Sequence, residues 1–268
     1  MSEPRGIPKA AGGAAESAYA CRAMTDDDFC AALTATISSS APELHAFRRD
    51  LHAHPELSRQ ETRTTKRIIE RLAGAGLAVR PFPGTGLVVD IGPEQASYRV
   101  ALRADIDALP VRERTGLDFA STNPGVCHAC GHDVHTAALL GAVLALATHE
   151  DELRERGIAV RAIFQAAEEI IPGGAHDAIA HRAMEGVDSV FALHCDPTVD
   201  VGQVGLREGP LTAACDHVRV LLDGRGGHTS RPQLTEDLIF ALGKVVTDVP
   251  AALGRRLDPR AGAALVWG

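Results

Sequence analysis

The stretch IAVRAIFQAAEE, residues 158–169, decides the fold class. It begins with a short apolar run that is typical of a buried central strand, and it ends in two adjacent carboxylates, Glu168 and Glu169. The run DSVFAL at 188–193 has the same character and is followed by His194. Periodicity alone does not separate such runs from buried helix, so the surrounding sequence has to decide.

Strands and helices alternate on both sides of this stretch. Helices are expected from about Ala41, within 62–77, over 135–153 and at 174–184. Strands are expected at 87–92, 98–107, 157–169 and 187–194. This order predicts an α/β domain with a mostly parallel sheet flanked by helices.

Three of the expected strands end in ionisable side chains. In open α/β sheets the carboxyl ends of the strands face the ligand crevice. We therefore expect one cluster at that edge, made of Asp105, Asp107, Glu168, Glu169 and His194.

Each of these features also has a purely structural explanation. Adjacent glutamates before a turn can be a solvated pair, aspartates can cap a strand, and a lone histidine on an apolar strand is usually a core or edge residue. Adjacent strand residues point to opposite sides, however, so Glu168 and Glu169 suit a metal ligand beside a carboxylate that faces water. Only the joint occurrence at strand ends favours a functional site.

Residues 127–135 read CHACGHDVH and place two thiols and three imidazoles within nine positions. This mixture suits a borderline-soft divalent metal ion. Two alternatives stay open, namely structural or incidental cysteines and a redox motif of the Cys-x-x-Cys type. A lone zinc knuckle would need a second ligand pair at matching spacing, and none follows in the sequence.

Composition limits the class of protein. The chain has 268 residues, of which 45% are hydrophobic and 23% charged, with a formal net charge of −8. These values exclude a disordered chain, a coiled coil, and a broad surface for nucleic acid or an anionic membrane. No window approaches the roughly 20 apolar residues of a membrane span and no signal peptide is recognised, so a cytoplasmic protein is expected. Residues 1–40 are expected to form a disordered leader.

The pattern changes after about Gly209, so we expect one domain over 41–210 and the start of a second over 211–268. The second block predicts a strand at 217–224, a helix within 234–257 and a strand at 263–268. Its sequence GGHTS lacks the lysine of a phosphate loop. It indicates either a surface turn or a flexible loop that presents His228.

Seven motifs follow one another in order along the chain. They are RRDLHAHPELSRQE (48–61), ALRADIDALPVRERTGLDFAS (101–121), NPGVCHACGHDVHTAALLGA (123–142), FQAAEE (164–169), GGAHDAI (173–179), VFALHCDP (190–197) and GRGGHTSRP (224–232). Together they resemble the aminoacylase and carboxypeptidase-type dinuclear metallohydrolases. Within these, they resemble the amidohydrolase branch that contains hippurate hydrolase, N-acyl-amino-acid amidohydrolases and auxin-conjugate hydrolases. The resemblance runs from about residue 41 to the last residue.

The resemblance implies roles for single residues. The metal ligands of this branch correspond to Cys130, His132, Glu169 and His194. Glu168 corresponds to the general base, and Asp107 to the carboxylate that orients a ligand. His228 corresponds to a histidine of the smaller domain that reaches into the partner subunit's site and polarises the substrate carbonyl.

The resemblance also implies cofactors, substrate and assembly. Two divalent metal ions per subunit are expected, and the donor set leaves zinc, manganese, cobalt and nickel open. The expected substrate is a small N-acyl amino acid or related amide, with no nucleic acid or membrane partner, in a homodimer when full-length. The expected fold is a zinc-exopeptidase-like catalytic domain with an inserted smaller α+β dimerisation or lid domain.

Two departures from the family pattern matter. Ala166 stands where relatives usually have proline, a change that removes no ligand. Relatives also continue through the rest of the small domain to a final metal-binding histidine, so this chain is expected to be a C-terminally truncated, incomplete amidohydrolase whose own activity is open. The alternative is a non-catalytic derivative that binds metal or ligand, or that dimerises.

Overall fold

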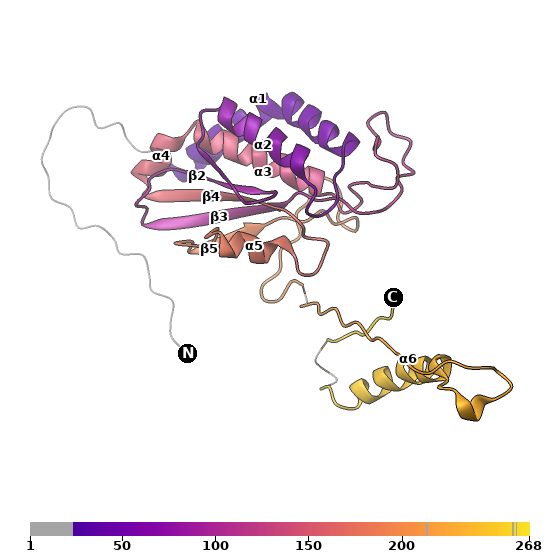
Figure 1. Ribbon diagram of the computed structural model, residues 1–268. Coiled ribbons are helices and arrows are strands. Elements are labelled where there is room, and N and C mark those ends of the chain that lie inside the picture. The colour runs from indigo at the N-terminus through magenta and orange to yellow at the C-terminus, as the bar shows by residue number, and fades with distance from the viewer. Residues whose placement is uncertain (1–23, 213, 259, 261) are drawn as a thin grey trace, which may run out of the picture. The chain divides into compact units, whose positions relative to one another are not determined.

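The computed structural model describes residues 24–212, 214–258, 260 and 262–268. The chain divides into two compact units, Met1–Gly205 and Leu206–Gly268, and each is described by itself. The sheet and most helices belong to the first unit, and helix α6 belongs to the second (Figure 1).

Helix α1 (Asp26–Ala53) begins earlier than expected. Thr25 caps it by accepting a hydrogen bond from the Asp28 N–H at 3.2 Å, and the acidic first turn complements the positive end of the helix dipole. The leader expected over 1–40 is therefore wrong for 26–40, and residues 1–23 lie outside the described residues. The first half of this helix has no strong apolar stripe, so its start is indicated in the sequence only by the cap and the acidic turn.

Five strands form one sheet in the order β1-β2-β4-β3-β5. They are β1 (Val79–Pro81), β2 (Leu87–Ile91), β3 (Tyr98–Asp105), β4 (Ile158–Gln165) and β5 (Ser189–Ala192). Strand β3 is parallel to both β4 and β5, whereas β2 is antiparallel to both β1 and β4.

The sheet is thus mixed, and the expectation of a mostly parallel sheet is wrong. The reason lies in the connections between strands. A connection between two strands that run in the same direction needs about a dozen residues or more. Only residues 82–86 join β1 to its neighbour β2, and only residues 92–97 join β2 to β3, on the far side of β4. Apolar periodicity carries no information about strand direction, but these short connections do.

Four further helices pack on the sheet, namely α2 (Thr62–Gly74), α3 (His132–Ala147), α4 (Glu150–Glu155) and α5 (Gly174–Ala180). In Figure 1, α1, α2 and α3 lie on one face and α5 on the other. Strand β4 contributes side chains to the two hydrophobic cores, one on each face of the sheet. Its Phe164 packs with Leu51 and Leu140 under the first face, and its neighbour Ile163 packs with Ala178 of α5. Among the described residues, no helix is both long and apolar enough to cross a membrane.

The described part of the second unit contains two helical segments and is otherwise irregular. It contains the 3₁₀ helix η1 (Pro232–Leu234) and α6 (Leu238–Gly254), which Asp237 caps through the Phe240 N–H at 2.9 Å. The strands expected at 217–224 and 263–268 are not formed, and the smaller α+β domain is not evident in residues 214–258 and 262–268. An extended segment becomes a stable strand only beside other strands, and the described part of this unit supplies none.

Candidate metal and catalytic site

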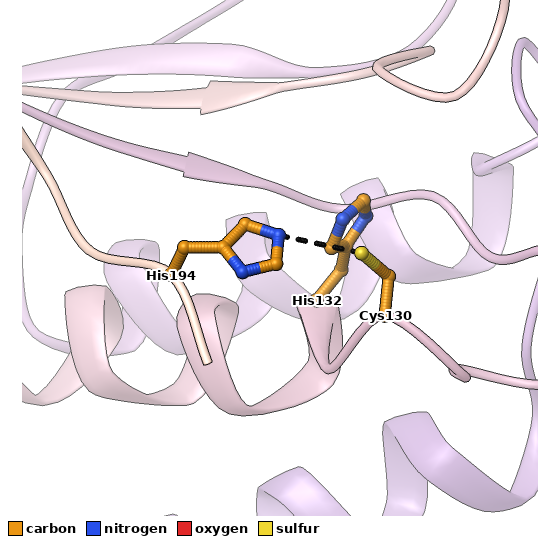
Figure 2. Close-up of side chains that lie close together, drawn as sticks. All are labelled: Cys130, His132 and His194. Atoms are coloured by element: carbon orange, nitrogen blue, oxygen red, sulfur yellow. Dashed lines mark hydrogen bonds between the residues drawn. The ribbon is translucent and has the colours of Figure 1, made fainter. Parts of the chain in front are cut away.

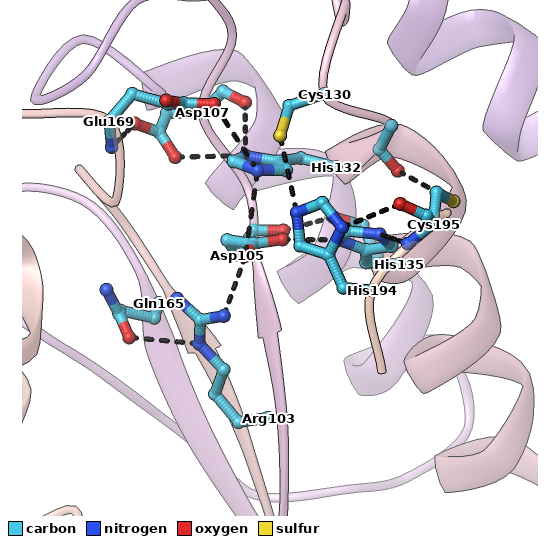
Figure 3. Close-up of polar contacts among 12 residues, drawn as sticks. Arg103, Asp105, Asp107, Cys130, His132, His135, Gln165, Glu169, His194 and Cys195 are labelled. Atoms are coloured by element: carbon cyan, nitrogen blue, oxygen red, sulfur yellow. Dashed lines mark hydrogen bonds and ion pairs between the residues drawn. The ribbon is translucent and has the colours of Figure 1, made fainter. Parts of the chain in front are cut away.

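The carboxyl ends of β3, β4 and β5 lie at one edge of the sheet, because these three strands run parallel. Asp105 ends β3 and pairs with Gln165 at the end of β4. Figure 3 shows side chains from these strand ends and from the start of α3 lying together. The residues expected to cluster at this edge are therefore close to one another.

Cys130, His132 and His194 form the first group of candidate metal ligands (Figure 2). One ligand atom of each lies within 4.8 Å of the other two. The Cys130 Sγ lies 3.3 Å from the His194 Nε2. Gly131 turns the chain from the thiol into α3 with a φ of 86°, and a Cβ there would come within 3.0 Å of the Cys195 Sγ. Glycine is therefore required at this turn.

In both histidines of this group, the Nε2 is the ring nitrogen left to bind a metal. The His132 Nδ1 lies 2.9 Å from the Asp107 carbonyl oxygen, and the His194 Nδ1 lies 2.7 Å from the Cys195 carbonyl oxygen. A carbonyl oxygen only accepts, so each Nδ1 carries the proton. Metal-binding histidines in proteins are held in this way through their other ring nitrogen.

Glu168 and Glu169 form a second group with His132, whose ligand atoms also lie within 4.8 Å of one another. The Glu169 Oε1 lies 3.6 Å from the His132 Nε2. Glu168 is exposed, and partial desolvation followed by the charges of Glu169 and Asp105 raises its pKa. A carboxylate with a raised pKa suits the role of a general base.

Asp107 holds the two groups together. It accepts hydrogen bonds from the Ser58 hydroxyl at 2.6 Å and from the Glu169 N–H at 3.0 Å. Burial alone would raise its pKa, but the neighbouring His132 ring and the hydrogen bonds from the Ser58 hydroxyl and the Glu169 N–H lower the pKa of Asp107 to about 2. The carboxylate therefore stays ionised and fixes the surrounding donors.

His135 supports the site without being free to bind a metal. Its Nδ1 donates to the Asp105 Oδ1 at 2.6 Å, and its Nε2 accepts from the Cys195 N–H at 2.8 Å. Both ring nitrogens are thus occupied, and the second bond holds the segment that carries His194. Sequence reasoning gave His135 no separate role, because nothing in its spacing points to the backbone of Cys195.

The donor set fits divalent metal ions. Burial, followed by the charge of Glu169, raises the pKa of the Cys130 thiol to about 12. Two buried atoms of the site, the His132 Nε2 and the Glu169 Oε1, lie 3.6 Å apart, and neither has a hydrogen-bond partner among the described residues. Converging lone pairs of this kind are costly unless a cation binds them. Sulfur, imidazole and carboxylate donors together are those of borderline divalent metals.

Two further residues of the sequence motifs have surroundings of their own. His228 lies in the second unit, on an exposed turn where the Ser230 hydroxyl contacts its Nδ1 at 2.8 Å. Cys127 is buried, and desolvation raises the pKa of its thiol, as it does for Cys130. Redox Cys-x-x-Cys motifs have a lowered thiol pKa, so these directions disfavour that alternative.

The chain is similar to known bacterial proteins over much of its length. It is 48% identical to a Rhodococcus jostii protein that bears the name of a glutamate–cysteine ligase, over 97% of this chain and 32% of that protein. It is 41% identical to the N-acetyl-L-cysteine deacetylase of Bacillus subtilis, over 87% of this chain and 55% of that enzyme. The chain therefore spans about half the length, or less, of these relatives.

A solved structure shares the fold. The Bacillus subtilis YXEP protein, a dinuclear metal-binding peptidase from the M20 family, matches with a TM-score of 0.61 and 42% identity, over 65% of this chain and 48% of that one. The family profile of peptidase family M20/M25/M40 matches residues 101–259, which is more than half of the chain and contains all the candidate site residues. This chain therefore belongs to peptidase family M20/M25/M40.

Proposed function

We propose that this chain carries most of the active site of a metal-dependent amidohydrolase. The substrate is an N-acyl amino acid or a related small amide, which is hydrolysed to a carboxylate and a free amine. The observation that supports this most is the gathering of Cys130, His132, Glu168, Glu169 and His194 at one edge of the sheet. The similarity to an N-acetyl-L-cysteine deacetylase supports the substrate class.

Cys130, His132, Glu169 and His194 would hold two divalent metal ions. The ion is zinc, manganese, cobalt or nickel, all of which suit this donor set. When bound, such ions lower the pKa of a water molecule and polarise an amide carbonyl. The similarity to a dinuclear metal-binding peptidase supports the number of ions.

Three further residues act beside the metal ligands, one by proton transfer, one by orienting His132 and one by stabilising the charge on the substrate carbonyl. Glu168 accepts a proton from the attacking water and returns it to the leaving amine, and its raised pKa helps it to serve as base and then as acid. Asp107 orients His132, whose Nδ1 lies 3.3 Å from the Asp107 Oδ1. His228 donates a hydrogen bond to the carbonyl oxygen as negative charge develops there.

We assign the two parts of the chain accordingly. Residues 41–210 are the N-terminal part of the catalytic domain, and residues 211–268 begin the smaller lid or dimerisation domain of a cytoplasmic homodimer. The division of the chain after Gly205 supports two domains. In such a homodimer, His228 acts in the site of the partner subunit.

The test combines metal analysis with hydrolysis. The protein is loaded with each of the four metals, and release of free amine is measured over a panel of N-acyl amino acids that includes N-acetyl-L-cysteine. The assay is run on this chain and on any longer form of the protein. We expect two bound ions per chain and cleavage of at least one substrate. Metal binding without cleavage by any form supports the non-catalytic alternative instead.

Glu168→Gln tests the assigned base. The amide cannot take up the proton, so hydrolysis is expected to fall by about a thousandfold or more. Metal content is expected to stay the same, because Glu168 is not one of the proposed ligands. Turnover near the wild-type rate in this variant would rule out Glu168 as the base.

A further inference from the structure

The residue before the two glutamates has an unusual backbone. Ala167 adopts a φ of 53°, in the left-handed region that residues with a side chain seldom occupy. Such a conformation costs on the order of 1 kcal/mol or more and persists only where neighbouring contacts hold it. Because Ala167 directly precedes Glu168, the contacts that hold its backbone also set where both glutamates point.

One of these contacts comes from a distant side chain. Glu61, which is 0% exposed, accepts a hydrogen bond from the Ala167 N–H at 2.7 Å through its Oε1. Its Oε2 accepts from the Thr85 hydroxyl at 2.6 Å. On the other side of the segment, the Gly174 N–H donates to the Ala167 carbonyl at 2.8 Å, and a Cβ on Gly174 would overlap the Ala166 oxygen. The peptide is therefore held on both sides.

Glu61 is not needed to cap α2, the helix that begins directly after it. It occupies the N-cap position of α2, yet its side chain makes no cap hydrogen bond. Glu56 caps this helix instead, by accepting from the Arg63 N–H at 2.9 Å and the Thr64 N–H at 2.7 Å. The Glu61 carboxyl group is thereby left to the Ala167 peptide.

Burial of Glu61 is also expensive. Among the described residues it has no ion-pair partner, and a buried carboxyl group without one costs free energy. Buried polar groups that cost stability are concentrated at functional sites. In the motif at 48–61, which ends with Glu61, only Ser58 has so far been linked to the site, through its hydrogen bond to Asp107.

We propose that Glu61 is a positioning residue, which sets the Glu168–Glu169 segment for metal binding and proton transfer by holding the Ala167 peptide. The proposal rests on the proposed function for what the two glutamates do. In this role, Glu61 itself contacts neither substrate nor metal. Its effect passes through one backbone hydrogen bond, so the shape of its side chain matters more than its charge.

Three variants separate this role from a structural one. Glu61→Ala removes the acceptor of the Ala167 N–H. Glu61→Gln keeps it, because the amide oxygen accepts from Ala167 while the amide nitrogen donates to the Thr85 oxygen. Glu56→Ala is the matched control, because it removes another carboxylate of the same motif. Among the described residues, the side-chain hydrogen bonds of Glu56 go to the first turn of α2 alone.

The first measurement is amide hydrogen exchange of the metal-free chain, read in the peptides that cover 165–170. We expect at least about tenfold faster exchange there in Glu61→Ala, with near wild-type exchange in Glu61→Gln and Glu56→Ala. The second is Co²⁺ affinity by titration. Loss of a group that holds a metal ligand in place typically weakens affinity about 10- to 100-fold, and we expect this only for Glu61→Ala.

The outcomes also distinguish this proposal from the proposed function. Unchanged exchange at 165–170 in Glu61→Ala overturns the positioning role, whatever the metal does. Equal loss of Co²⁺ affinity in Glu56→Ala also overturns it, because the effect is then one of general stability. Failure of the wild-type chain to bind Co²⁺ rejects the proposed function, while the exchange measurement still decides whether Glu61 holds the segment.

Discussion

His135 acts on His194 through the backbone. Its Nε2 accepts from the Cys195 N–H, and its Nδ1 is fixed by Asp105. His135→Phe keeps a ring of similar size but removes both hydrogen bonds, so the segment carrying His194 loses its anchor. Metal affinity is expected to fall about 10- to 100-fold, as for other groups that orient a metal ligand. Co²⁺ titration of the purified variant measures this.

The control for His135→Phe is His176→Phe, which makes the same change on an exposed residue of α5. This variant should bind Co²⁺ as the wild type does. Equal affinity in both variants would show that His135 has no part in holding the site.

Cys130 and Cys127 differ in what a metal does to their protons. Burial and Glu169 raise the pKa of Cys130 to about 12, so a bound cation must displace the thiol proton. Co²⁺ binding is therefore expected to release a proton, to tighten as pH rises, and to produce a thiolate-to-cobalt absorption band. Cys130→Ser should lose the band and Cys127→Ser should keep it. A band that depends on Cys127 instead would show that Cys127, and not Cys130, is the metal ligand.

Residue types and spacing predicted a metal site, and the family resemblance named the candidate ligands, but neither indicated the residues that hold those ligands in place. Cys130, His132 and Glu169 stand in dense local motifs with recognisable chemistry. Glu61 acts on a peptide 106 residues away, and His135 on one 60 residues away. Such contacts exist only after α2, α3 and the sheet have packed, and a single sequence carries no signal for them.

Among the elements, α1 offers the sharpest test, because its start at Asp26 was not expected. If Thr25 caps this helix, Thr25→Ala should lower the free energy of unfolding by about 1 kcal/mol. Thr34→Ala is the matched control, because Thr34 lies inside α1 and alanine favours helix there. Urea unfolding of both variants measures the difference. Equal stability of the two would place the true start of the helix elsewhere.

The strands show what periodicity can and cannot predict. The apolar runs ending near Glu169 and His194 correctly located β4 and β5. Only β4 is the buried central strand that such a run predicts, because β5 is the last strand of the sheet and its Phe191 is 61% exposed. Apolar periodicity did not predict the direction of the strands or their neighbours. It gave no sign that β2 runs antiparallel to β4, whereas β3 and β4 run parallel. The segment 217–224 alternates like a strand and the segment 263–268 is an apolar run, yet neither pattern forms a sheet without a partner strand.

At the scale of the whole molecule, two buried histidines should oppose each other in the pH dependence of stability. The hydrogen bond to Asp133 raises the pKa of His52, so its contribution is present at low pH and is lost as pH rises through that raised value. Burial lowers the pKa of His128 from 6.5 to about 4. Its contribution is present above 6.5 and is lost as pH falls toward 4.

His128→Phe isolates the second effect. His128 is 5% exposed and neither ring nitrogen has a partner among the described residues, so phenylalanine leaves no orphaned group. The unfolded chain takes up a proton on His128 between pH 6.5 and 4 while the folded chain does not. Relative to the wild type, the variant should therefore gain about 3 kcal/mol in free energy of unfolding as pH falls from neutral to about 4.

Urea unfolding of the metal-free protein at several pH values between 4 and 7 measures this gain, and comparison with the wild type cancels the titration of shared carboxylates. His52→Gln serves as the control of opposite sign, because it removes a contribution that is largest at acidic pH. It should lose most stability, relative to the wild type, where His128→Phe gains most. Parallel stability curves for His128→Phe and the wild type would show that His128 is protonated as easily in the folded chain as in the unfolded one.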